Sequence, residues 1–106
     1  MDEHITDVHE LAGMAPDNMR GVAESLADEL DFMQKTLDGL KAHIAENGAV
    51  EWYVNGSQQH WRESPAMKAY TALIPRYNAT IKQLVALVPD VAEDMGDELD
   101  EWLREN

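Results

Sequence analysis

"NGAVEWYVNGSQQHWRESP", residues 47–65, is the stretch that decides the fold, because turn signals enclose an alternating apolar pattern. The alternating residues are Val50, Trp52 and Val54, and such alternation is typical of a strand with one apolar face. Asn55-Gly56 follows directly and is the strongest short signal for a β-hairpin, since both central residues of a type I′ turn need positive φ. We therefore predict a β-hairpin whose two-residue loop is Asn55-Gly56.

This loop also predicts the register of the hairpin. The expected cross-strand pairs are Val54 with Ser57, Trp52 with Gln59, Val50 with Trp61, and Glu51 with His60. One face of the hairpin then carries both tryptophans. Because a two-stranded hairpin is marginally stable in water, we expect this face to pack against a further surface.

A helical pattern precedes the hairpin. Apolar residues recur at steps of three or four from Met19 to Ile44, which is the spacing of one face of a helix. Pro16 is suited to a first helical position, and Asn47-Gly48 is a stop signal. We therefore predict a helix over about residues 16–46.

A second helical pattern follows the hairpin. Ser64 is a good N-cap and Pro65 a good first residue, and apolar residues then recur at heptad spacing to Val88. Pro75 falls inside this pattern, where a proline costs roughly 3 kcal/mol and usually kinks a helix. The sequence therefore predicts a helix over about 64–88 that is bent near residues 71–75.

Acidic segments lie at both ends of the chain. Residues 1–15 form an acidic N-terminal segment in which we expect a short helix, capped by Thr6 and ended by Gly13. Residues 90–106 form an acidic C-terminal segment with a predicted helix at about 91–104. Its apolar residues include Met95, Leu99, Trp102 and Leu103. Residues 16–89 are the expected oligomerisation body.

These elements predict a mainly α fold, an antiparallel long-helix hairpin joined by a short β-hairpin, with a short C-terminal helix. Two such helices bury one stripe each, yet several apolar side chains fall off that stripe. We therefore expect the chain to form a homo-oligomer. The residues expected at the contact between copies are Phe32, Trp52, Trp61, Leu73 and Val85.

The formal net charge of −13 is concentrated at the two ends of the chain. Residues 1–10 contribute −4 and residues 90–106 contribute −7, which leaves −2 for residues 11–89. No acidic residue lies between Ser64 and Pro89. This segment contains three basic residues, and a fourth lies just before it. Together they predict a shallow strip that touches DNA phosphates: Arg62, Lys68, Arg76 and Lys82. The alternative is ordinary solubilising charge on a helix.

No catalytic, cofactor-binding or metal-binding constellation is recognisable in the sequence. The chain has no cysteine, its four histidines lack metal-ligand spacing, and the acids of the last predicted helix lack the spacing of a calcium loop. We therefore expect a protein that is not an enzyme and needs no cofactor. No apolar run approaches the length of a membrane span, and the acidic N-terminus is unlike a signal peptide, so we expect a cytoplasmic protein.

Residues 30–89 resemble the short form of phage terminase small subunits. The matching pieces are Glu46-Asn47-Gly48, Tyr53-Val54-Asn55-Gly56, Ser64-Pro65, Tyr77-Asn78, Ile81-Lys82-Gln83-Leu84 and Leu87-Val88-Pro89. The resemblance implies a non-enzymatic oligomer that recognises double-stranded viral DNA and recruits or regulates the large terminase subunit. It also implies a location in the host cell cytoplasm.

We expect the C-terminal helix, through Met95, Leu99, Trp102 and Leu103, to bind the large subunit. An alternative function is that of a small acidic module that mimics DNA and occupies a basic site on a partner. The concentration of negative charge in the two ends, rather than along the body, weighs mildly against this alternative.

Overall fold

The computed structural model describes residues 7–89, and all structural statements below concern this part of the chain. The elements in chain order are α1 (Val8–Ala12), the short 3₁₀ helix η1 (Asp17–Met19), α2 (Arg20–Asn47), β1 (Val50–Asn55), β2 (Gln58–Glu63) and α3 (Pro65–Ala86). The prediction of a mainly helical protein with a β-hairpin between two long helices is confirmed. The helix predicted at 91–104 lies outside the described residues.

The boundaries of α2 follow from local chemistry. Residues 17–19 form the 3₁₀ helix, so the α-helix starts at Arg20, slightly later than predicted. The Arg20 side chain holds this start by donating to the Ala15 carbonyl at 2.9 Å and pairing with Asp17 at 3.1 Å. At the other end, Gly48 adopts a positive φ of 91° and its N–H bonds the Ile44 carbonyl, which confirms the predicted stop.

Helix α3 begins and continues as its sequence requires. The Ser64 hydroxyl accepts a hydrogen bond from the Met67 N–H at 3.0 Å, so the predicted N-cap is confirmed. The helix runs unbroken through Pro75 to Ala86. Pro75 lies on the exposed side, as does Thr71, whose carbonyl loses its i+4 donor. Water can solvate that carbonyl, which explains why the proline does not end the helix.

The predicted register of the hairpin is wrong by two positions. Trp52 pairs with Trp61, Glu51 with Arg62, and Val54 with Gln59. The loop is Gly56-Ser57, and Gly56 has a positive φ of 63°, whereas no non-glycine residue in the described range 7–89 has a positive φ. This is the φ pattern of a type II′ turn, which places glycine first. A shift of two positions keeps every side chain on its face, so both tryptophans still share one side.

The short N-terminal helix α1 belongs to the same core as the long helices. Its N-cap is Asp7, which accepts from the His9 N–H at 2.8 Å, rather than the predicted Thr6. Gly13 ends the helix as predicted. The buried residues around it are Leu11, Ala12 and Ala15, which lie in one cluster with side chains of α2 and α3. Residues 7–15 therefore pack against the helical body.

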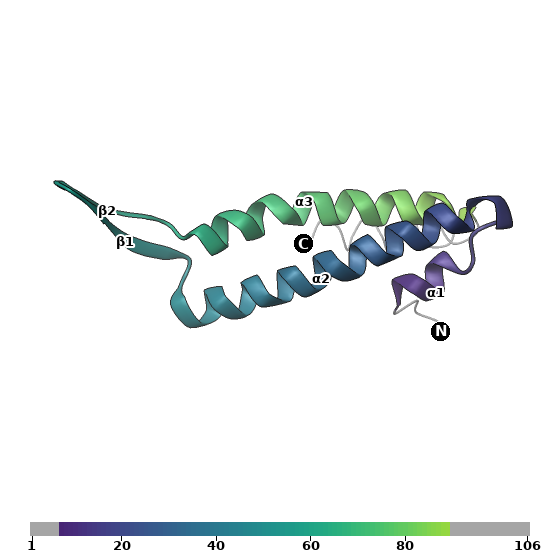
Figure 1. The fold of residues 1–106 in the computed structure, drawn as a ribbon, viewed down its shortest axis with the longest axis horizontal. Helices are drawn as coiled ribbons and strands as arrows, with labels where there is room; N and C mark the ends of the chain where they lie inside the picture. Colours follow the sequence, from purple (N-terminus) through teal and green to yellow (C-terminus); the bar gives the residue numbers. More distant parts are fainter. Residues whose placement is uncertain (1–6, 90–106) are drawn as a thin grey trace.

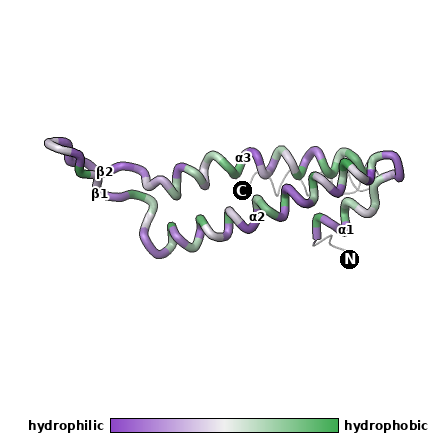
Figure 2. The backbone as a smooth tube through the Cα atoms, viewed as in Figure 1, coloured by the Kyte–Doolittle hydropathy of each residue, from purple (hydrophilic) through white to green (hydrophobic). Residues whose placement is uncertain are grey.

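Helices α2 and α3 lie side by side in an elongated molecule of 60 × 26 × 18 Å (Figure 1). Its radius of gyration is 17.8 Å, whereas a compact chain of about 100 residues has about 13 Å. The largest fully buried side chains are Leu30 of α2 and Leu84 of α3. Hydrophobic and hydrophilic positions alternate along both helices, as expected of amphipathic helices (Figure 2). The β-hairpin projects beyond the ends of the helices, away from α1 (Figure 1).

Candidate interaction surfaces

One side of the β-hairpin is an exposed apolar surface, which we call the hairpin face. It consists of Val50, Trp52, Val54 and Trp61, each of them between 51% and 65% exposed. The Trp52 and Trp61 rings pack edge to face, with centroids 5.3 Å apart and planes at 72°. The rings therefore stabilise the hairpin itself while half of each side chain stays in water.

The opposite side of the hairpin is polar and internally paired. The Arg62 guanidinium donates to Glu51 from Nε at 2.7 Å and from an Nη atom at 2.6 Å. The Arg62 Cζ atom lies 3.9 Å from the centroid of the Tyr53 ring, and the Tyr53 ring in turn packs against His60. The ion pair with Glu51 distinguishes Arg62 from the other three cations predicted to contact DNA.

The remaining three cations lie on α3, and we call them the basic strip: Lys68, Arg76 and Lys82. All three are exposed, and none forms an ion pair within residues 7–89. At 100° per residue they span about a third of the helix circumference. Exposed alanines separate them, and no acid occurs on this helix. Within residues 7–89, the basic strip is therefore a small surface of positive charge without ion-pair partners.

The residues predicted for contact between copies divide into three groups. Phe32 is 66% exposed on α2, and the two tryptophans are exposed on the hairpin face, so all three are accessible. Leu73 is only partly exposed. Val85 is 4% exposed within the core cluster, so its predicted role at a surface contact is wrong. That cluster includes residues of α1, so a two-helix pattern underestimated what the chain covers by itself.

Helix α2 carries a further surface feature that we did not predict from the sequence. Exposed residues follow its outward side at steps of three or four, and we call them the outer stripe: Ser25, Asp28, Phe32, Lys35 and Gly39. A Cβ added at Gly39 would meet nothing within 4 Å. Glycine in a helix interior costs about 1 kcal/mol relative to alanine, and no contact at Gly39 within residues 7–89 compensates for that cost. The sequence signal that could have indicated the outer stripe is Gly39, which lies seven positions after Phe32 and so on the same side of the helix.

The ionisable groups of residues 7–89 include one with a shifted pKa and no metal-binding cluster. No group of three histidine, aspartate or glutamate side chains in residues 7–89 is arranged to hold a metal ion. Burial, and then the negative charge of Asp38, raises the pKa of the Tyr77 phenol above its ordinary value of 10.0. Tyr77 packs against the core of the helix pair, so this shift reflects its position there.

Two further predictions have different outcomes. None of the helices in residues 7–89 has the length and apolar character needed to cross a membrane. The residues predicted to bind the large subunit, Met95, Leu99, Trp102 and Leu103, lie outside the described residues.

Comparison of the chain with protein-family models, with curated proteins and with solved structures finds no match.

Proposed function

We propose that this protein is a non-enzymatic, self-assembling adaptor of the phage terminase small-subunit kind. In this role it binds viral DNA and recruits or regulates the large terminase subunit. The sequence resemblance over residues 30–89 supports the proposal. The observation that carries it is the hairpin face, because four half-exposed apolar side chains on a projecting hairpin suit contact with another protein surface.

The scaffold in this proposal is an antiparallel helical hairpin made by α2 and α3. Shared burial of Leu30 and Leu84 in one cluster supports it, as does the position of the β-hairpin at one end of the molecule (Figure 1). Such a scaffold holds the hairpin face apart from the basic strip. Contact between copies and contact with DNA then use different surfaces.

DNA contact is assigned to the basic strip. Three exposed cations on an acid-free helix, with no ion pair among residues 7–89, suit phosphate groups, and copies in an oligomer would repeat them along a duplex. The same acid-free helix weighs against a DNA mimic, which needs carboxylates along a continuous face. Recruitment of the large subunit is assigned to the acidic residues 90–106.

Two measurements test the proposal. Light scattering during size-exclusion chromatography should give a mass of at least two copies, and a monomer at high concentration would count against self-assembly. The large terminase subunit should be recovered with the intact chain and lost when residues 90–106 are removed. Recovery with neither chain would contradict the assignment to the terminase small-subunit class.

A further inference from the structure

The outer stripe of α2 is an exposed helix face with a single large apolar anchor. Phe32 lies at its centre with 66% of its surface exposed. Asp28 and Lys35 flank it at four positions before and three after, and their side chains are 78% and 76% exposed. Lys35 pairs with Asp31 at 3.5 Å, and Asp28 lies 3.9 Å from His9. These exposed contacts leave both side chains room for further partners.

Small residues extend this face in both directions from Phe32. Ser25 and Gly39 lie seven positions before and after it, and Gly21 and Ala42 continue the same spacing. All four are exposed, and an added Cβ would meet nothing within 4 Å at either glycine. Glycine lowers helix stability relative to alanine, and no neighbour within residues 7–89 requires a glycine at position 39. A close approach by the backbone of a second copy would explain a glycine at this position.

The face is complementary to itself when its direction is reversed about Phe32. Reversal places Ser25 directly opposite Gly39, and it places Asp28 and Gly21 within one position of facing Lys35 and Ala42. Opposite charges then meet opposite charges, and small residues meet small residues, which allows close helix packing. We infer that α2 of one copy packs antiparallel on α2 of a second copy, with the two Phe32 side chains next to the two-fold axis.

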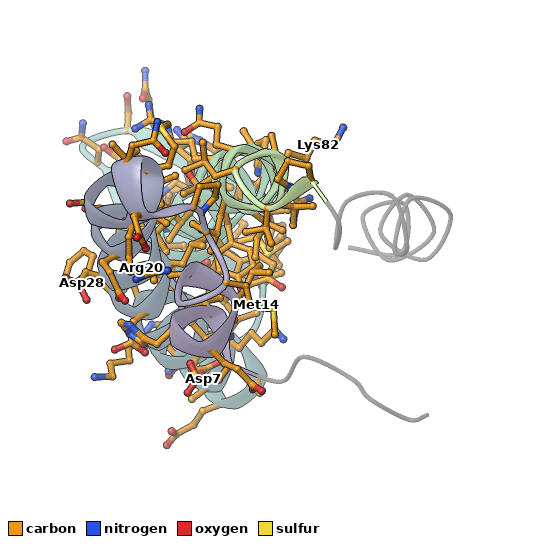
Figure 3. The ribbon with its side chains drawn as sticks, turned by 90° about the vertical axis from the view of Figure 1, so that its right-hand side faces the viewer. Asp7, Met14, Arg20, Asp28 and Lys82 are labelled. Atoms are coloured by element: carbon orange, nitrogen blue, oxygen red, sulfur yellow. The ribbon has the colours of Figure 1, made fainter. Side chains whose placement is uncertain are left out.

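This dimer rests on the proposed self-assembly and specifies its contact. It is compatible with DNA contact by the basic strip, because Asp28 and Lys82 project from opposite sides of the molecule when it is viewed end-on (Figure 3). It also places the two hairpin faces at opposite ends of the dimer, since the helices run in opposite directions. Those faces then remain available for contacts between dimers.

Cysteine cross-linking tests the direction of the helices, because the natural chain has no cysteine. A full-length Ser25→Cys chain mixed with a tagged Gly39→Cys chain should give a cross-linked pair with a short bismaleimide. The Ser25→Cys chain alone should give at least tenfold less product. Efficient cross-linking of Ser25→Cys to itself would indicate parallel helices and overturn the inference.

Substitutions on the outer stripe test the contact between copies without a cross-linking reagent. Gly39→Leu and Phe32→Glu should each weaken dimer formation at least tenfold, as measured by sedimentation equilibrium. Gly39→Leu improves helix propensity, so loss of the dimer would not reflect unfolding. Ala72→Leu adds the same side chain to the exposed side of α3 and should leave dimer formation unchanged. Circular dichroism checks that every variant stays helical.

The outcomes separate this inference from the proposed function. A natural chain that is monomeric at high concentration overturns both. A natural chain that assembles, together with Gly39→Leu and Phe32→Glu variants that assemble equally well, overturns the α2 contact and leaves self-assembly standing. If Phe32→Glu keeps its mass but no longer recovers the large terminase subunit, the outer stripe binds that subunit and the inferred dimer is wrong.

Discussion

Trp52 and Trp61 face each other directly across the β-hairpin, with ring centroids 5.3 Å apart in an edge-to-face arrangement. The pair joins two roles, since it holds β1 to β2 and also forms most of the exposed hairpin face. An aromatic pair of this kind contributes about 0.5–1.5 kcal/mol beyond the burial of its surface. The hairpin therefore depends on the same residues that we assign to contact with other proteins.

Replacing Trp61 by alanine should weaken both the hairpin and the assembly. We expect faster hydrogen exchange of the amides of β1 and β2, and a lower average mass in solution, with unchanged helical content. Gln58→Ala, which changes the same strand on its polar side, is the control and should keep the mass of the natural protein. An unchanged mass for Trp61→Ala would exclude the hairpin face from self-assembly.

Replacing Lys68, Arg76 and Lys82 together by glutamine should weaken DNA binding at every sequence tested. Each phosphate contact removed should reduce the slope of log K against log salt by about 0.9. Fluorescence anisotropy with a labelled duplex at several salt concentrations measures both quantities. Arg62→Gln should have little effect, because Glu51 already neutralises that side chain. Equal losses from Arg62→Gln and the triple variant would contradict the assignment of the basic strip.

Replacing Val85 by alanine should destabilise the fold rather than act only on assembly. The side chain is 4% exposed, so its truncation should lower the free energy of unfolding by roughly 1–3 kcal/mol. Urea unfolding followed by circular dichroism gives this quantity. Val54→Ala makes the same chemical change at a residue that is 57% exposed, and should shift stability by no more than about 0.5 kcal/mol.

Replacing Pro75 by alanine should stabilise the protein. The substitution adds an N–H that can bond the Thr71 carbonyl, and it removes the ring from a helix interior. We expect a gain of about 1–3 kcal/mol in the free energy of unfolding, measured by urea denaturation. Pro65→Ala at the first helical position is the control and should change stability little. A loss of stability in Pro75→Ala would mean that the proline shapes α3 in a way that the fold requires.

Stability should fall at alkaline pH because of Tyr77. Burial and Asp38 raise the pKa of the folded-state phenol above 10.0, so the folded chain holds this proton more tightly than the unfolded chain. The corresponding stability is fully present below about pH 10 and is lost as the pH rises through the folded-state pKa. Tyr77→Phe removes this titration, so its melting temperature should decline less steeply than that of the natural protein. Parallel declines would contradict the assignment.

The sequence by itself determined the features that depend on neighbouring residues. Gly48 ends α2 because only a residue that tolerates positive φ fits there, and Ser64-Pro65 starts α3 by capping. The existence of the hairpin, and the side on which its tryptophans lie, follow from a period of two that survives a shift of two positions.

The tertiary structure decided what depends on pairing between distant residues. The Trp52–Trp61 and Glu51–Arg62 pairs belong to the observed register, whereas the predicted register offered Trp52 a glutamine and Glu51 a histidine. These cross-strand contacts outweigh the local preference of Asn55-Gly56 for the loop. Likewise, Val85 is buried in a core that includes α1, which no pattern within α3 can indicate. Pairing and burial are properties of segments brought together, so only the folded chain fixes them.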